Sequence, residues 1–170
     1  MNRSMIFLAL MVAGSTTAIA APRGLQPNDL VTLDRVSAPL LSPDGQRLVY
    51  ALREVDFDAN KASVGLWLTD TRGSTPRRLT SKGSSASSAQ WSSDGKALYF
   101  LSSRSGSSQV WRLRLDGGEA EQVTNYALDV GSYKLSPDGK ALAFGLEVFP
   151  DCTDLACTTK RLQETAARKT

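Results

Sequence analysis

The sequence predicts an all-β fold, a partial β-propeller of about two and a half four-stranded antiparallel blades, preceded by a signal peptide and a short helix. One motif occurs three times, as LSPDGQRLVY (41–50), WSSDGKALYF (91–100) and LSPDGKALAF (135–144). A second motif occurs twice without a gap, as WLTDTRGSTPRRLT (67–80) and WRLRLDGGEAEQVT (111–124). The glycines of the first motif lie 50 and 44 positions apart, a period typical of propeller blades.

The first twenty residues have the pattern of a secretory signal peptide, the expected segment 1–20. Arg3 supplies a positive charge, Met5–Ala13 is an apolar run, and an A-x-A pattern follows. The run is shorter than the ~20 residues that a membrane-spanning helix needs, and an uncleaved anchor is the alternative. We expect cleavage between Ala20 and Ala21, which predicts a periplasmic or secreted protein with no membrane contact after cleavage.

Residues 21–38 are expected to form a lead-in to the blades. Asn28 is a suitable N-cap residue after a proline, and the spacing predicts a short helix over Asn28–Val36. The side chains expected to face inward are Leu30, Leu33 and Val36.

Residues 39–149 are expected to contain the first two blades and the start of a third, over Pro39–Ser81, Ala89–Tyr126 and Gly131–Phe149. Asp and Gly favour tight turns, since Asp bonds to nearby backbone and Gly accepts a positive φ. The apolar runs between turn signals predict buried strands. The expected strands are Leu48–Leu52, Val64–Asp70 and Arg78–Thr80, then Leu98–Leu101, Gln109–Asp116 and Gln122–Thr124, and finally Leu142–Leu146.

Two kinds of polar segment interrupt the strands. The stretch Asp56–Ser63 is long enough to lengthen the first hairpin. Serine clusters at 81–88 and 102–108 are expected to be exposed loops, with linker-like flexibility as the alternative.

Cys152 and Cys157 lie in the final segment, 150–170, expected to be a cysteine loop followed by a polar tail with a truncated end. In an exported chain the simplest interpretation is a small disulfide, because thiols pair in an oxidising compartment. Free thiols or pairing with other partners are the alternatives. A zinc site is disfavoured, because two cysteines cannot complete a tetrahedral shell without histidine.

The composition excludes several functions. With 170 residues and no histidine, the chain cannot supply a Ser-His-Asp or Cys-His catalytic unit. The net charge of +3 comes from scattered residues, which does not indicate a nucleic-acid partner. We therefore expect no catalytic residue, no metal site and no cofactor in this chain.

Three other sets of residues have a structural and a functional interpretation. For Trp67 and Trp111, matched positions in the repeat favour a place in the blade core over ligand stacking. For Asp44, Asp94 and Asp138, turn chemistry favours bonding to the nearby backbone over calcium binding.

For Glu54 and Glu147, a solvated loop charge is favoured over an anchor for a substrate amino group.

The segments Leu30–Tyr50 and Glu54–Leu68, with the repeated Asp-Gly hairpins, resemble the start of the prolyl oligopeptidase family, in particular its exported dipeptidyl- or acylaminoacyl-peptidase branch. The resemblance implies an N-terminal β-propeller that gates short peptides into a C-terminal α/β-hydrolase domain. That domain's chemistry needs a G-x-S-x-G elbow and a histidine. Gly83–Ser87 comes near to the elbow but lacks its closing glycine. No family catalytic residue can be placed here, and the chain is predicted to be inactive alone.

Two and a half blades do not close a ring, since propellers close with four to eight. We therefore expect an N-terminal part of a longer exported hydrolase, with the remaining blades and the hydrolase domain as its partners. The stretch 105–125 also resembles TolB-like periplasmic propellers, which implies a protein-binding module as the alternative function.

Overall fold

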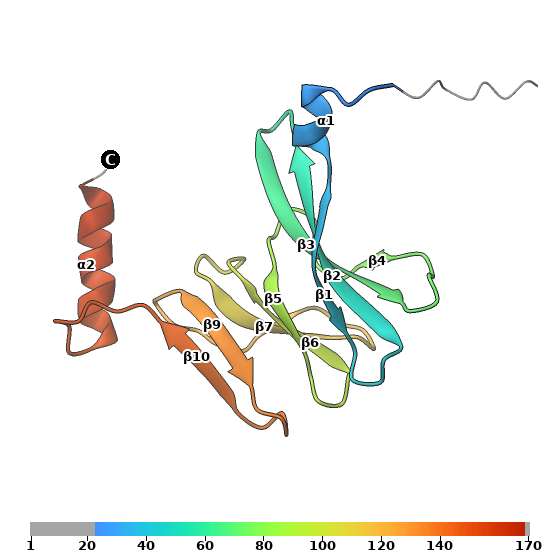
Figure 1. The fold of residues 1–170 in the computed structure, drawn as a ribbon. Helices are drawn as coiled ribbons and strands as arrows, with labels where there is room; N and C mark the ends of the chain where they lie inside the picture. The colour runs from blue at the N-terminus through green and yellow to red at the C-terminus, as the bar shows by residue number, and fades with distance from the viewer. Residues whose placement is uncertain (1–22, 169–170) are drawn as a thin grey trace, which may run out of the picture.

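A computed structural model describes residues 23–168 and contains three antiparallel sheets in succession, followed by a helix (Figure 1). The predicted signal peptide, residues 1–20, and its predicted cleavage position between Ala20 and Ala21 lie outside the described residues. The elements are α1 (Pro27–Thr32), β1 (Arg35–Leu41), β2 (Arg47–Asp56), β3 (Lys61–Asp70), β4 (Arg77–Arg78), β5 (Ser87–Trp91), β6 (Ala97–Ser102), β7 (Gln109–Arg114), β8 (Glu121–Gln122), β9 (Val130–Leu135), β10 (Leu142–Leu146) and α2 (Leu155–Ala167).

The first two sheets are complete four-stranded blades with the orders β1-β2-β3-β4 and β5-β6-β7-β8. The third sheet pairs β9 with β10 alone. The repeat is visible in the register, because Tyr50 lies opposite Trp67 in the first blade and Phe100 lies opposite Trp111 in the second. The expected all-β partial propeller is therefore confirmed.

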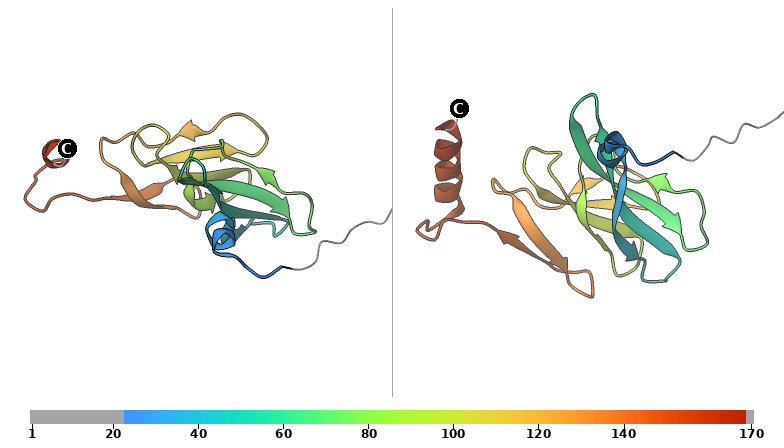
Figure 2. Two further views of the ribbon diagram at one scale, coloured as in Figure 1. Left: turned by 90° about the horizontal axis from the view of Figure 1, so that it is seen from above. Right: turned by 45° about the horizontal axis from the view of Figure 1, so that its top comes forward.

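Figure 2 shows the blades from two further directions. The buried side chains of the core come from both of the first two blades and lie between them. The cluster between the first and second blades includes Val49, Leu66, Leu98 and Phe100. A smaller cluster joins the second blade to the third hairpin, with Leu101, Val110, Val130 and Tyr133 as its buried members. Each sheet contributes alternate residues to its two faces, so the middle blade is apolar on both.

The predicted helix Asn28–Val36 is wrong in its bounds, its cap and its orientation. The helix α1 covers Pro27–Thr32 with Gln26 as its N-cap, and the Asp29 side chain accepts a hydrogen bond from the Gln26 N–H. Leu30, Leu33 and Val36 are 58%, 53% and 66% exposed. The helix ends early because the chain enters β1 at Arg35, where pairing with Arg53 of β2 takes over.

The first strand of each blade was not predicted. The strands β1, β5 and β9 precede the Asp-Gly turns and form the edges of their sheets. Ser87 and Ser88 belong to β5, and Ser102 ends β6 with only 3% exposure, so the serine clusters are only partly exposed loops. Polar strands of this kind form because the neighbouring apolar strand offers its hydrogen-bonding edge.

The expected polar tail contains the 13-residue helix α2. Asp154 caps it by accepting a hydrogen bond from the Cys157 N–H at 2.8 Å. Arg161 holds it to the preceding loop, because its Nη1 donates to both carboxylate oxygens of Asp151 at 2.6 and 2.7 Å. The helix stands apart from the sheets in Figures 1 and 2. Within residues 23–168, neither helix has the length and apolarity needed to cross a membrane.

Candidate functional site

The three Asp-Gly turns are built from the same hydrogen bonds. In the first turn, the Ser42 hydroxyl donates to Asp44 Oδ1 at 2.5 Å, and the Gln46 N–H donates to the same oxygen at 3.1 Å. The second and third turns repeat both bonds. The serine hydroxyl, followed by the backbone N–H, lowers the pKa of all three carboxyls, those of Asp44, Asp94 and Asp138.

Each turn carboxylate is therefore engaged by its own turn, as the turn interpretation of these residues expects. Across the part of the chain that the structure describes, no three His, Cys, Asp or Glu side chains lie together in an arrangement that could hold a metal ion.

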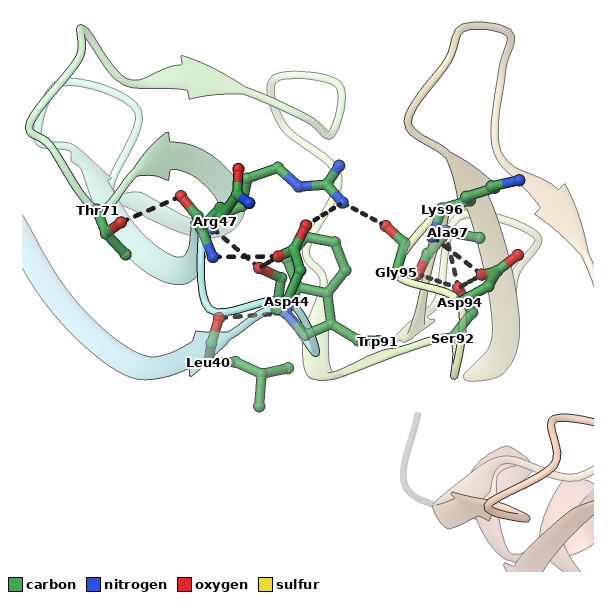
Figure 3. A network of polar contacts seen from close by, with 12 residues as sticks. Leu40, Asp44, Arg47, Thr71, Trp91, Ser92, Asp94, Gly95, Lys96 and Ala97 are labelled. Carbon is green, nitrogen blue, oxygen red and sulfur yellow. Dashed lines mark hydrogen bonds and ion pairs between the residues drawn. The ribbon is translucent and has the colours of Figure 1, made fainter.

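A polar network joins the first two blades beside these turns (Figure 3). The Arg47 guanidinium donates to the Gly95 carbonyl oxygen at 2.8 Å and lies 5.2 Å from the centre of the Trp91 ring. The Trp91 indole N–H donates to the Leu40 carbonyl oxygen at 3.2 Å. The first blade thus binds the Asp-Gly turn and the first strand of the second blade. These contacts fix the position of the two blades relative to each other.

At the opposite end of the first blade, β2 and β3 continue as a hairpin arm, residues 53–64. In the second blade, the last paired residues of β6 and β7 are Ser102 and Gln109. The equivalent pair in the first blade is Leu52 with Gly65, and β2 and β3 stay paired beyond these residues as far as Asp56 with Lys61. This confirms that Asp56–Ser63 lengthens the first hairpin.

The hairpin arm borders an open hollow of about 650 Å³. Residues before β1 and from the loop between β4 and β5 line its other sides. Its charged lining residues are Asp34, Glu54, Asp56, Asp58, Lys61 and Lys82. The hollow can bind charged groups, but it contains no histidine or cysteine to serve as a base or thiol nucleophile. We take the hairpin arm and this hollow as the candidate functional site.

Arg78 anchors the hairpin arm to β4. Its guanidinium pairs with Glu54 and donates through Nε to the Thr80 carbonyl oxygen at 2.7 Å. Gly65 makes the space, because a Cβ there would lie 2.7 Å from Arg78 Nη2. Glu54 is therefore a partly buried member of β2, and the interpretation as a solvated loop charge is wrong. Glu147 is exposed just beyond β10.

Trp67 and Trp111 occupy equivalent positions with different surroundings. Trp111 packs against the core cluster between the blades, and its indole N–H donates to the Ser102 carbonyl oxygen at 3.1 Å. Trp67 is half-buried beneath Arg78, and its indole N–H is buried without an acceptor. Core packing thus describes Trp111 better than Trp67.

The structure joins Cys152 and Cys157 by a disulfide at the start of α2, with their Cα atoms 5.5 Å apart. Six residues therefore close a small ring beside the helix cap.

Sequence reasoning missed Arg47, Arg78 and Gln109. Gln109 is fully buried, and its side-chain amide donates to the carbonyl oxygens of Tyr126 and Leu128 at 3.0 and 3.1 Å. For Arg78 and Gln109, the available signal was a difference between the two copies of the repeat. Gly65 stands where the second blade has Gln109, and an arginine in the paired strand fills the space.

Successive antiparallel blades with repeated Asp-Gly turns define a β-propeller repeat protein. Residues 30–148 match the family described as the TolB beta propeller domain, and the chain belongs to that family.

The sequence comparisons link this propeller to a peptidase. Dipeptidyl-peptidase 5 of Porphyromonas gingivalis is 36% identical over 124 residues, which are 73% of this chain and 18% of that protein. The chain spans about a fifth of the length of the curated relatives it matches. The predicted resemblance to peptidases of the dipeptidyl-peptidase type is thereby confirmed.

Two solved structures agree with the fold. A putative TolB from Agrobacterium tumefaciens has a TM-score of 0.53 and 29% identity, covering 67% of this chain and 39% of that one. An acylaminoacyl peptidase has a TM-score of 0.59 at 18% identity, covering 74% of this chain and 20% of that one. The second likeness shows the shared fold alone.

Proposed function

We propose that this chain is the N-terminal propeller segment of an exported serine peptidase and gates the access of short peptides to a hydrolase domain outside residues 1–170. The observation that carries the proposal is the 36% identity to a dipeptidyl-peptidase of which these residues match only 18%. A gating segment acts by excluding large substrates, so it needs walls and rims and no reacting group.

The chain by itself is expected to hydrolyse nothing, since it contains neither histidine nor a G-x-S-x-G elbow. Release of p-nitroaniline from a dipeptidyl-p-nitroanilide by the purified 170-residue chain would contradict this assignment. Reading the coding sequence beyond Thr170 tests the proposal itself. An elbow followed by a histidine supports it, and further Asp-Gly blades up to a stop codon overturn it.

The hairpin arm is the part of this chain best placed to restrict entry. It projects beyond the end of its own blade, and Arg78 holds it in place. Shortening residues 53–64 to the length of the second hairpin, within the longer protein, should raise cleavage of long peptides relative to a dipeptidyl-p-nitroanilide. A matched control replaces Gly117 and Gly118, in the turn at the other end of the second blade, by a different turn pair. An unchanged ratio in the arm variant would contradict a gating role for the arm.

A second candidate function is a protein-binding propeller. The family match and the 29% identity to a putative TolB favour it. It is distinguished from the peptidase by the coding sequence beyond Thr170, where no elbow would follow.

The protein is proposed to be exported, with its signal peptide removed after Ala20. The apolar run Met5–Ala13 and the disulfide between Cys152 and Cys157 support this, because disulfides persist in oxidising compartments. N-terminal sequencing of the protein recovered from the periplasm or medium should begin at Ala21. An N-terminus at Met1 would contradict cleavage.

A further inference from the structure

The junction between the second blade and the third hairpin lacks the arginine that bridges the first two blades. At the first junction, the Arg47 guanidinium packs over the Trp91 ring and donates to the Gly95 carbonyl oxygen (Figure 3). The same guanidinium forms an ion pair with Asp44 at 3.8 Å. The residue that corresponds to Arg47 in the second blade is Ala97. An alanine side chain is too short to reach the third hairpin, so this bridge is missing at the second junction.

An open hollow of about 290 Å³, which we call the junction hollow, lies at the second junction where an arginine would reach across. The residues equivalent to the three partners of Arg47 all line it, and they are Asp94, Leu135 and Gly139. Ala97 lines it as well. The junction hollow therefore keeps a carboxylate, an apolar wall and a glycine carbonyl but lacks the guanidinium that these groups surround at the first junction.

The Gly139 carbonyl oxygen is an open acceptor in the junction hollow. It accepts no hydrogen bond from residues 23–168, whereas the equivalent oxygen of Gly95 accepts one from Arg47. Gly95 is buried and Gly139 is exposed. Strands beyond β10 are not needed for such a bond, because Arg47 contacts the second blade at β5 and at the turn after it. The equivalent strand β9 and the turn after it are both present.

Two of the three basic side chains that line the junction hollow are already neutralised. Arg112 pairs with Glu121 at 2.5 Å, and Arg114 pairs with Asp116 at 2.6 Å. Because each of these cations has its own carboxylate, the two pairs present no net charge to a ligand.

The remaining charges of the lining are two carboxylates and one ammonium group. In Asp94 and Asp138, Oδ1 accepts the hydrogen bonds of the turn, which leaves Oδ2 for a ligand. Lys96 is the opposing cation, and the corresponding residue of the first blade is the neutral Gln46. The net charge at the junction hollow is therefore negative, which favours a cationic ligand.

We propose that the junction hollow binds the side chain of an arginine from a peptide, in the position that Arg47 takes at the first junction. The guanidinium of the ligand donates to the Gly139 carbonyl oxygen and pairs with Asp94, and its apolar stem lies against Leu135. A guanidinium suits this arrangement because its planar fork donates several hydrogen bonds in fixed directions.

Binding is measured by NMR titration of the chain with N-acetyl-arginine amide, followed at the backbone amides of Ala97 and Gly139. The control ligand is the citrulline analogue, which has a similar shape but no charge. The arginine ligand should bind with a Kd of about 1–10 mM, as expected for a few contacts at an open site, and the citrulline ligand about tenfold or more weakly. Equal affinities for the two ligands, or no shift at either amide, would overturn the proposal.

Substitutions in the chain test whether the junction hollow is the binding site. Ala97→Arg supplies a guanidinium from the chain itself, as Arg47 does, and should abolish binding of the arginine ligand. Lys96→Gln copies the neutral residue of the first blade at an exposed position and should tighten binding by about two- to fivefold. Lys140→Gln, the equivalent change in the third hairpin, is the control and should leave the Kd unchanged.

Unchanged binding by the Ala97→Arg variant would overturn the junction hollow as the site. Equal effects of Lys96→Gln and Lys140→Gln would do the same, because they would show a response to net charge alone. The binding is measured on this chain without a hydrolase domain, so a negative result leaves the proposed function untouched.

Discussion

Arg47 of the first blade donates a hydrogen bond of 2.8 Å to the carbonyl oxygen of Gly95 in the second blade (Figure 3). The same guanidinium lies over the Trp91 ring, whose N–H bonds back to Leu40 of the first blade. Charge, aromatic contact and backbone bonding therefore meet at one junction between the blades.

Arg47→Met should lower the free energy of unfolding by about 1–2 kcal/mol, because it removes a charged hydrogen bond and a cation–π contact while keeping an apolar stem. Urea denaturation followed by circular dichroism measures the change. Arg77→Met, at an exposed position in β4, is the matched control and should change stability little. Equal losses in the two variants would show that the junction does not stabilise the packed blades.

Gly65→Ala should loosen the hairpin arm, because the added Cβ would lie 2.7 Å from Arg78 Nη2 and would displace the partner of Glu54. Hydrogen exchange across residues 53–64 should become faster, and the free energy of unfolding should fall by about 1 kcal/mol. Gly131→Ala is the control, since its Cβ meets only one atom, at 4.0 Å. Unchanged exchange in the arm would remove Arg78 as its anchor.

Trp111→Phe should cost about 1 kcal/mol more than Trp67→Phe. Trp111→Phe removes the hydrogen bond to Ser102, whereas Trp67→Phe removes an indole N–H that is buried without an acceptor. Both variants remove the same atoms, but only Trp111 loses a hydrogen bond and contacts with the core cluster, so its cost should be the larger. Urea denaturation gives the free energy of unfolding of the two variants. Equal losses in both would contradict the predicted difference between Trp111 and Trp67.

The turn carboxyls should make stability depend on acid. The pKa values of Asp44, Asp94 and Asp138 are lowered in the folded chain, chiefly by serine hydroxyls. Their stabilising contribution is therefore present above the unfolded value of about 4 and is lost as the pH falls through the lower folded values. A triple Asp→Asn variant retains an acceptor oxygen in each turn but should show a weaker fall of stability between about pH 5 and 2. If stability depends on pH in the same way in the variant and in the unsubstituted chain, these three carboxyls are not the source of the acid dependence.

Reduction of the disulfide between Cys152 and Cys157 should add the mass of two hydrogen atoms and loosen the first turn of α2. The closed loop is short, so the unfolded chain gains little entropy and the sheets should keep their stability. Mass spectrometry with and without reductant, followed by hydrogen exchange, checks both parts. No mass change would show that the thiols are free, and unfolding of the sheets would contradict a local role.

Local patterns of residues are sufficient to predict the turns, the apolar strands and the repeat. Asp and Gly act through bonds within a few residues, and alternating apolar runs report burial wherever the chain goes. These local rules place β10 at Leu142–Leu146, as the structure has it. They also relate Trp67 to Trp111.

Contacts between segments distant in the sequence set the strands β1, β5 and β9, the early end of α1 and the pairing of Glu54 with Arg78. The polar residues at the start of β5 form a strand because the neighbouring strand β6 offers unpaired backbone groups, which no pattern in their own residues records. Likewise, Trp67 and Trp111 share a motif and are both partly buried, but only Trp111 packs against the core cluster. The first blade covers the face of the second blade that carries Trp111, whereas no described blade covers the corresponding face of the first. Local chemistry determines a turn or a strand, whereas contacts between distant segments decide what each side chain meets.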